Sequence, residues 1–376
     1  MTKQQPDWNK IRENYPALEK GIFLNTATCG IMSKTTAEVG KQYFQEFAEL
    51  GGLARNSWSK ALEELKEQLR VMLKVKNGEI SLIANFTLGI NYLNWMLEKT
   101  SKKVLLLESD FPSVTSPWVK NNFHITYITA DENGAFSPEL IEQLIVENQI
   151  EILALSHIQF NTGFRADVEA VGKICQKHKV LFILDNTQSF SAFEIDVEKC
   201  HVDVLIASCY KWSTAGFGSG FMYLSHQVLE KYPAPVIGNN GMGVVIDAEK
   251  ETDPKLKAKA FEIGHQNFSG LICLNQALKE LDTIGFKNIQ DRITALNQKL
   301  ISRLKEIKGV KIVSNYPPEN TSCIVVIEGN EEHEKLFAAK GIQVAARNKG
   351  LRISFHFYNS FEEMETFCKV ASEIYN

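Results

Sequence analysis

The sequence has no pair of cysteines at CxxC spacing, no block of Lys and Arg, and no apolar run that approaches a membrane span. Its seven cysteines are an odd number, which fits reduced thiols better than disulfides or a zinc site. The polar N-terminus MTKQQPDWNKIRENYP lacks the apolar core of a signal peptide. Together with a formal net charge of -4, these absences predict a cytoplasmic protein with no nucleic-acid partner, no membrane association and no metal site.

Strand-like and helix-like segments alternate from about residue 80 to 225. The chain has 376 residues, 44% of them hydrophobic, which is enough for a large domain and a smaller one. The helix-like segment SPELIEQLIVENQ opens with Ser137 and Pro138, a pair typical of an N-cap and a first turn. The alternation predicts the α/β class, with a mainly parallel sheet between helices. The predicted strands are VLLLES (104–109), HITYIT (124–129), IEILALS (150–156), VLFILD (180–185), VDVLIAS (202–208) and GFMYLS (220–225).

The last third of the chain has a different organisation. Residues 226–260 look irregular, and a helical region over 268–307 follows them. A second set of strands and helices begins with the strand-like VKIVS (310–314) and ends with FEEMETFCKVASEIY (361–375). The sequence therefore predicts a large domain over 16–284 and a smaller α+β domain formed by 1–15 and 285–376.

A lysine and an aspartate follow two buried strands. Lys211 lies in SCYKWSTAGFGSG between Tyr210 and Trp212, just after VDVLIAS, and burial among aromatic rings lowers a lysine pKa and favours its nucleophilic form. Asp185 ends VLFILD, where a carboxylate needs a cation or a strong donor. Because ligands of parallel sheets bind beyond the carboxyl ends of the strands, we expect both at one site. Taken singly, Lys211 could extend to water and Asp185 could cap a helix.

A buried amine, a buried acid and an aromatic ring at one sheet edge match the needs of pyridoxal phosphate (PLP). The amine forms a Schiff base with the cofactor, the acid keeps the pyridine nitrogen protonated, and the ring stacks on the pyridine. Each residue alone is common in a structural role. The joint occurrence predicts a PLP site.

The segment LDNTQSFSAFEIDVEKCHVDVLIASCYKWSTAGFGSGFMYLS resembles the core of the class V aminotransferases. This fold-type I PLP group includes cysteine desulfurases, selenocysteine lyase, kynureninase and isopenicillin N epimerase. The resemblance covers nearly the whole chain and implies a fold-type I PLP-transferase that forms a homodimer with shared active sites. The other matching segments are FLNTATCG (23–30), NFTLGIN (85–91), FPSVTSPW (111–118), SHIQFNTGFRADVEAVG (156–172), FEIGHQNFSG (261–270) and LRISFHFYNS (351–360).

The resemblance implies catalytic roles for Lys211, which forms the Schiff base, and for Asp185, which partners the pyridine nitrogen. Gln188 would hydrogen-bond the phenolic oxygen of the cofactor, and Phe111 would stack on its ring. On the substrate side, Arg352 would pair with the substrate carboxylate, a role that suits the fork of donors on a guanidinium. Its alternative is a surface charge at a strand end. Asn25 and Ala27 belong to the matching N-terminal segment FLNTATCG and are predicted to contact the substrate.

The cofactor phosphate would bind at a helix start, where Phe86 and Thr87 offer backbone N–H groups and partial positive charge. Ser208 would add a hydroxyl. Tyr210 stands where the family often has a histidine, so a phenol replaces an imidazole as a donor. His265 stands where many relatives have a threonine that reaches the phosphate of the neighbouring subunit, and its ring could donate there.

The chain departs from the desulfurase pattern in the connection GIQVAARNKGLRIS, which is short and contains no cysteine where desulfurases carry a nucleophilic thiol. The sequence therefore predicts a PLP-dependent enzyme that acts on a small amino acid, with aminotransferase-type chemistry through Lys211. A cysteine or selenocysteine lyase and an amino-acid epimerase are alternatives. A catalytically silent PLP-binding protein is an alternative of another class, against which the retention of Arg352 counts.

Overall fold

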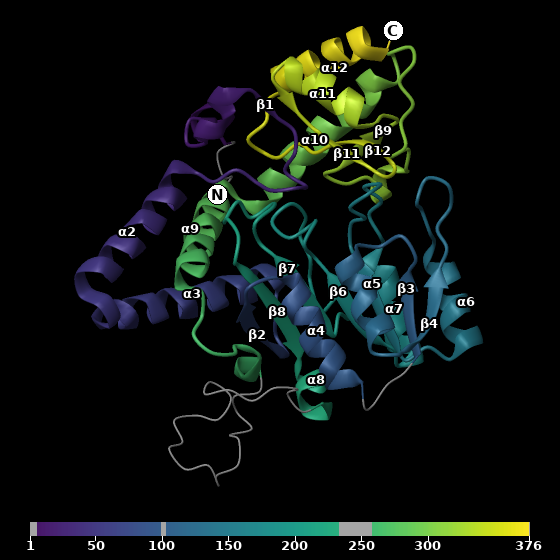
Figure 1. Ribbon diagram of the computed structural model, residues 1–376. Coiled ribbons are helices and arrows are strands. Elements are labelled where there is room, and N and C mark those ends of the chain that lie inside the picture. The colour runs from purple at the N-terminus through teal and green to yellow at the C-terminus, as the bar shows by residue number, and fades with distance from the viewer. Residues whose placement is uncertain (1–5, 99–102, 233–257, 376) are drawn as a thin grey trace.

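The computed structural model describes residues 6–98, 103–232 and 258–375 (Figure 1). Its main sheet has seven strands in the order β2-β8-β7-β6-β5-β3-β4. The run from β7 to β4 is parallel, whereas β8 pairs antiparallel with both β7 and β2, so the predicted mainly parallel α/β sheet is confirmed. The strands are β2 (Gly78–Ile83), β3 (Lys103–Leu107), β4 (His124–Ile128), β5 (Ile152–Ser156), β6 (Leu181–Asp185), β7 (Val204–Ser208) and β8 (Gly220–Ser225).

Helices cover both faces of this sheet because its strands are apolar on both sides. Along β5, Leu153 and Leu155 belong to one buried cluster and Ile152 and Ala154 to another, as expected when successive side chains point to opposite faces. The first cluster includes residues of α3 (Arg55–Leu73), α6 (Pro138–Asn148), α7 (Val168–His178) and α9 (Phe268–Ile284). The second includes residues of α4 (Phe86–Leu97), α5 (Pro112–Lys120) and α8 (His226–Lys231).

A smaller domain lies over one end of the sheet (Figure 1). Its three-stranded antiparallel sheet has the order β11-β12-β9, and a two-stranded parallel pair joins β1 to β10. A third buried cluster fills the space between these strands and their helices. The elements are β1 (Ile22–Phe23), β9 (Val325–Ile327), β10 (Ile342–Gln343), β11 (Ala345–Arg347), β12 (Gly350–Ile353), α10 (Phe286–Leu304), α11 (Glu331–Ala339) and α12 (Phe361–Tyr375). The chain thus has the expected fold-type I arrangement of a large and a small domain.

Two further helices precede the main sheet. They are α1 (Trp8–Arg12) and α2 (Lys34–Leu50), and α2 packs with α3 and α9 in an arm beside the sheet (Figure 1). The domain boundaries inferred from the sequence, 16–284 for the large domain and 1–15 with 285–376 for the smaller one, remain a prediction. The pairing of β1 with β10, and the position of Leu24 in the small-domain cluster, tie residues 22–24 to the smaller domain.

Several local predictions can be compared with the structure. Ser137 is the N-cap of α6 and accepts a hydrogen bond from the Leu140 N–H, as predicted. The helical region 268–307 contains two helices, α9 and α10, that meet at Gly285, whose φ of 91° suits glycine. The predicted strand at 310–314 is wrong, because only Ile312 forms an isolated bridge.

Part of the segment expected to be irregular, 226–260, is regular: α8 fills 226–231, and a short 3-10 helix spans Ala258–Phe261. The remainder, 233–257, lies outside the described residues. No helix in the described ranges combines the length and apolar character that a bilayer crossing requires.

Candidate active site

The predicted site residues meet at the carboxyl ends of β5, β6 and β7. Asp185 is the last residue of β6 and lies opposite Ser156 of β5, while Ser208 is the last residue of β7. Lys211 follows three residues later on the loop. A cavity of about 490 Å³ lies at this edge, and the starts of α4 and α5 close its other side. Its wall includes Phe86, Thr87, Phe111, Asp185, Gln188, Ser208, Tyr210 and Lys211, so the structure brings together eight residues that the sequence predicted for one site.

Lys211 is buried between two aromatic rings. Its Nζ lies 5.8 Å from the ring centroid of Phe111 and 5.6 Å from that of Tyr210. The pKa of Lys211 is lowered to about 8, mainly by burial and next by the positive charge of Arg352, while the negative charge of Asp185 opposes the shift. The amine is therefore held closer to its neutral, nucleophilic form than an ordinary lysine.

Asp185 is a buried carboxylate without a partner cation in direct contact. One of its oxygens accepts a hydrogen bond of 2.8 Å from the Thr187 N–H. Burial raises the pKa of Asp185, and the nearby carboxylate of Asp110 raises it further. A protonated pyridine nitrogen would supply the missing positive partner, and in turn the carboxylate would keep that nitrogen protonated.

Gln188 is fixed by its neighbours with one donor left over. Its Oε1 accepts from the Trp212 indole N–H at 2.9 Å, and its Nε2 donates to the Ala27 carbonyl at 3.0 Å. An amide nitrogen carries two protons, so one remains for a ligand in the cavity. This geometry fits a contact with a phenolic oxygen.

The start of α4 lies at one end of the cavity and carries groups that suit an anion. Asn85 caps the helix, and the hydroxyls of Thr87 and Ser113 lie 2.9 Å apart. The Phe86 N–H donates to the Ser208 Oγ at 2.8 Å, so this N–H is already used, and the Ser208 hydroxyl proton is the group available at that point. Helix N-termini and hydroxyls favour phosphate oxygens.

Ser113 was missed by the sequence analysis. It is the second residue of α5, directly after the Phe111-Pro112 pair, and lines the cavity. Ser113 could have been predicted from the fact that a second helix, α5, begins at the same edge of the sheet. Phe160 also lines the cavity and contacts the Phe111 ring edge to face at 5.2 Å between centroids.

Four predicted residues lie outside the wall of this cavity: His265, Asn25, Ala27 and Arg352. His265 lies beside Arg55, with the ring Nδ1 3.4 Å from the guanidinium Nη2, and lines a separate cavity of about 160 Å³. Asn25 accepts from the Thr28 hydroxyl at 2.6 Å, and the Ala27 N–H donates to Ser354. Asn25 and Ala27 thus contact protein groups that support the site. A direct contact with the substrate stays a prediction for both.

Arg352 is a buried guanidinium with no carboxylate partner. It is 2% exposed, donates from Nη1 to the Phe160 carbonyl at 3.1 Å and from Nη2 to the Thr28 hydroxyl at 2.6 Å, and has no partner at Nε. Burial lowers its pKa to about 9, and the neighbouring Arg347 adds to the shift. Arg347 donates to the same Thr28 hydroxyl at 2.9 Å. Among the described residues no carboxylate forms an ion pair with Arg347 or Arg352. An anion from outside the chain would therefore stabilise the buried guanidinium of Arg352.

The residues present therefore fit PLP. Lys211 would bond to its aldehyde carbon, Asp185 would pair with its pyridine nitrogen, and Phe111 would stack on its ring. The start of α4 would hold its phosphate. Nothing in the described ranges gathers three or more His, Cys, Asp or Glu side chains into a possible metal site.

The model of the family "Aminotransferase class-V" matches residues 22–367. The chain belongs to this family. A "Probable cysteine desulfurase" of Borreliella burgdorferi is 26% identical over 401 residues, covering 95% of this chain and 94% of that protein. Members of the family and solved homologues bind PLP, so this class-V family member is a PLP-dependent enzyme.

Solved structures share the fold over almost the whole class-V chain. The apo cysteine desulfurase of Thermococcus onnurineus superposes with a TM-score of 0.89 at 21% identity, covering 100% of this chain and 99% of that one. C-DES, described as a cystine C-S lyase in complex with its product cysteine persulfide, gives a TM-score of 0.86 at 18% identity, covering 96% and 99% of the two chains. A C-DES mutant carries glycine covalently linked to the PLP cofactor. The family and fold inferred from the sequence are thereby confirmed.

The depressed pKa of Lys211 predicts selective reactivity. In cofactor-free protein, trace acetylation followed by peptide mapping should give a titration midpoint for Lys211 near pH 8, well below an ordinary lysine near 10.4. The pKa shifts downward because burial disfavours the charged amine, so the reactive neutral amine appears at a lower pH. Arg352→Ala should move the midpoint upward, because it removes a neighbouring positive charge. A midpoint for Lys211 at or above the ordinary value would contradict the described environment.

Proposed function

We propose that this class-V family member is a C–S lyase that eliminates sulfur from a cysteine-type amino acid and releases it without a persulfide on the protein. The relatives named above as desulfurase and cystine C-S lyase support cleavage of a C–S bond. They favour the lyase alternative over the aminotransferase chemistry that the sequence suggested. The observation that carries the proposal is the lack of a thiol where a desulfurase needs one.

The segment that would carry a nucleophilic thiol is a tight hairpin here. β11 pairs with β12 from Ala345↔Arg352 to Arg347↔Gly350, and only Asn348 and Lys349 lie in the turn. The hairpin contains no cysteine and is too short for a loop that reaches the cavity. Without an attacking thiolate, the sulfur of the substrate must depart as a leaving group.

The thiol of Cys29 interacts with the charge of Lys211, and its environment makes it a weak nucleophile. It is half-buried, and its Sγ donates to the backbone carbonyls of Gly30 and Tyr210 at 3.4 and 3.6 Å. Burial raises the pKa of Cys29, although the positive charge of Lys211 opposes the shift. A thiol with a raised pKa carries little thiolate at neutral pH, so Cys29 serves the turn that holds Gly30 against the Lys211 loop.

PLP, when bound, supplies an electron sink for the charge left at the substrate α-carbon. The chain's own residues then do the rest. Arg352 binds the carboxylate and fixes which α-substituent faces Lys211. Lys211, whose pKa is lowered to about 8 mainly by burial, takes the α-proton in its neutral form. The electron pair left by that proton expels the β-sulfur, and the remaining three-carbon fragment hydrolyses to pyruvate and ammonia.

The product set tests this chemistry. Purified holoenzyme incubated with cysteine or cystine should form pyruvate and ammonia, with sulfide released from cysteine and cysteine persulfide from cystine. Cys29→Ser should leave the rate unchanged, because no step uses this thiol. Alanine as the main product would contradict elimination and indicate desulfuration. Turnover that requires an added 2-oxo acid would restore the aminotransferase reading.

Arg352 separates an enzyme from a silent PLP-binding protein. Arg352→Ala should lower kcat/KM by about 100-fold, because a bidentate pair in a desolvated pocket contributes roughly a few kcal/mol. Arg352→Lys should recover only part of this loss, since it keeps the charge but not the fork. Arg347→Ala is the matched control on the same hairpin and should have a smaller effect. Equal loss in all three variants, or loss of the cofactor in Arg352→Ala, would show a structural role.

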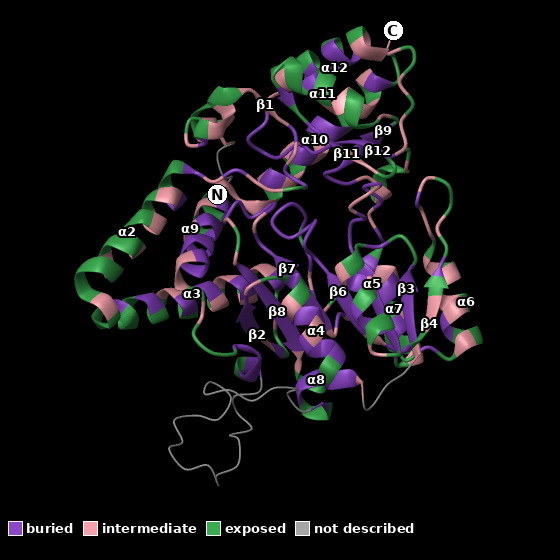
Figure 2. Ribbon diagram, in the orientation of Figure 1, coloured by how far each residue is buried: buried purple, intermediate pink, exposed green. Residues whose placement is uncertain are grey.

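We further propose a homodimer in which His265 serves the site of the neighbouring subunit. His265 is exposed beside Arg55 and does not line the Lys211 cavity of its own chain. The adjoining end of the arm exposes large apolar side chains, which are costly in a monomer. They are Phe44, Phe47, Leu50 and Leu53, exposed by 61, 53, 50 and 86%. Figure 2 shows α2 coloured mainly as exposed or intermediate.

Sedimentation of the holoenzyme tests this assembly. The wild type should sediment as a dimer, and Leu53→Glu together with Phe47→Glu should shift it toward a monomer that binds PLP more weakly. Leu336→Glu, at an exposed apolar position on the small domain, should leave the dimer intact. A wild-type monomer with full cofactor affinity would overturn the proposal.

A further inference from the structure

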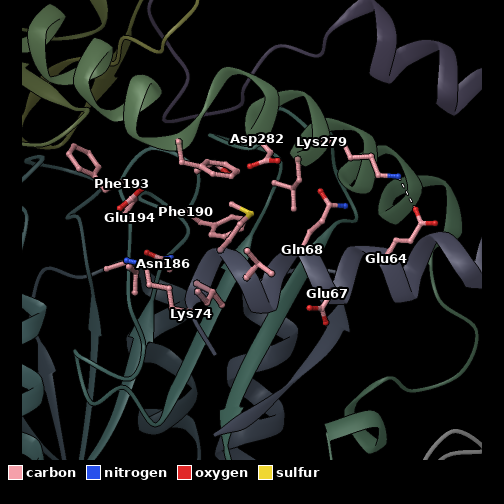
Figure 3. Close-up of a pocket in the computed structure, with 17 residues that line it drawn as sticks. Glu64, Glu67, Gln68, Lys74, Asn186, Phe190, Phe193, Glu194, Lys279 and Asp282 are labelled. Atoms are coloured by element: carbon pink, nitrogen blue, oxygen red, sulfur yellow. Dashed lines mark hydrogen bonds and ion pairs between the residues drawn. The ribbon is translucent and has the colours of Figure 1, made fainter. Parts of the chain in front are cut away.

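A second cavity lies behind the active site, between α3, α9 and the segment 186–195 (Figure 3). Its volume of about 570 Å³ falls in the range that small organic ligands occupy. None of its wall residues belongs to the wall of the Lys211 cavity. It is therefore a separate place in the fold, and the proposed chemistry does not use it.

Eight of the 17 residues that form the wall are apolar. In Figure 3, Phe190 and Phe193 come from the segment after Asp185, and Gln68 and Asp282 face the same space from the two helices. Val71 lies at the mouth and is 68% exposed, so a bound apolar group would remove it from water. Such a wall selects a ligand with an aromatic or branched aliphatic body.

The lysines at the rim already have acidic partners. Lys279 forms an ion pair of 2.8 Å with Glu64, and Lys74 lies 4.0 Å from Asp196. These two cations are therefore poor candidates for binding an anionic ligand. The carboxylates that remain decide which charge the cavity prefers.

Glu194 and Asp282 stand at the rim without an ion pair to any described residue, and Glu67 has only a 3.9 Å contact with Arg70. The rim thus has an excess of negative charge over an apolar interior. This combination is complementary to an organic cation, whose charged head stays at the mouth while its body enters the cavity.

The inner wall of the cavity is bonded to the loop that carries Lys211. The Ser191 hydroxyl lies 2.9 Å from the hydroxyl of Ser213, two residues beyond Lys211. Gln188, two residues before Phe190, lines the Lys211 cavity and accepts from the indole of Trp212, which is adjacent to Lys211. Ser191 has a φ of 71°, a left-handed conformation that is unusual for serine and is held by its surroundings. A ligand that shifts Phe190 would act directly on these bonds.

We infer that this cavity is a second ligand site, which takes a small organic cation with an apolar body and whose occupancy is sensed at the Lys211 loop. The inference does not depend on whether the enzyme eliminates sulfur or transfers an amino group. It depends on the shape of the cavity, the charge at its rim and the hydroxyl contact between Ser191 and Ser213.

The test is calorimetric titration of the holoenzyme with benzyltrimethylammonium, with the cofactor absorbance recorded in parallel. A quaternary ammonium cannot bond covalently to the cofactor, so a spectral change reports the protein environment. We expect one equivalent to bind and the cofactor band to shift. The anion 3-phenylpropionate, of similar shape, should bind much more weakly.

Substitutions at the rim locate the binding. Asp282→Asn and Glu194→Gln should each weaken the affinity about two- to fivefold, the size of an exposed charge contact. Glu147→Gln, at an exposed carboxylate on α6 far from the cavity, is the matched control and should change nothing (Figure 1). Val71→Trp should block the mouth and abolish binding while the cofactor stays bound.

Three results would overturn the inference. The absence of binding at millimolar concentration, or binding that Asp282→Asn, Glu194→Gln and Val71→Trp all leave unchanged, would remove the ligand site. Binding that follows the rim variants but leaves the cofactor band and the affinity for PLP unchanged would remove the coupling to Lys211. Both readouts are independent of turnover, so they remain decisive if the proposed elimination chemistry is wrong.

Discussion

The site is built around buried charges that lack partners within the described chain. Lys211 lies among aromatic rings, the Asp185 carboxylate accepts from one backbone N–H, and the Arg352 guanidinium donates only to neutral oxygens. Burying such groups without counter-charges costs stability, and the fold must hold them in place against water. The cofactor aldehyde would bond to Lys211, the pyridinium would pair with Asp185, and the substrate carboxylate would pair with Arg352. Each contact would offset the free-energy cost of burying that residue. The unpaired charges therefore specify the ligand chemistry.

The two domains share the task of holding these charges. The main sheet supplies Lys211 and Asp185 from adjacent strand ends, since β6 and β7 are parallel neighbours. The smaller domain supplies Arg352 from β12, and the Thr28 turn joins the two, because Thr28 accepts from Arg352 while Gly30 donates to Tyr210 at 2.9 Å. A side chain at Gly30 would meet the Lys211 carbonyl at 2.0 Å, so this close approach requires glycine. These contacts fix the position of the Arg352 guanidinium relative to the Lys211 amine.

Sequence patterns predicted most of the large domain because its strands are apolar on both faces and end in polar residues. Asp185, Ser208 and Lys211 could be placed at one edge for the same reason. The antiparallel contacts of β8 could not be predicted, since an apolar run does not show the direction of its neighbour. VKIVS has strand composition, yet it forms a single bridge while Val310 and Ile312 pack against the small-domain cluster. Tertiary packing outweighs local propensity there.

The side chains that the sequence analysis missed are those brought in by helix starts and by packing between helices. Ser113 reaches the cavity because α5 begins beside α4, and the second cavity arises where α3 and α9 diverge over the 186–195 segment. Neither depends on a motif. His265 shows the converse case, because its motif was recognised while the described chain leaves it outside its own site.

The central claim is that Lys211 is the residue that bonds to PLP. The most direct measurement is reduction of the PLP-loaded protein with borohydride, followed by proteolysis and mass spectrometry of the labelled peptide. The account predicts one pyridoxyl group per chain, on Lys211, and none in Lys211→Ala. A label on another lysine, or an unchanged yield of label in Lys211→Ala, would contradict it.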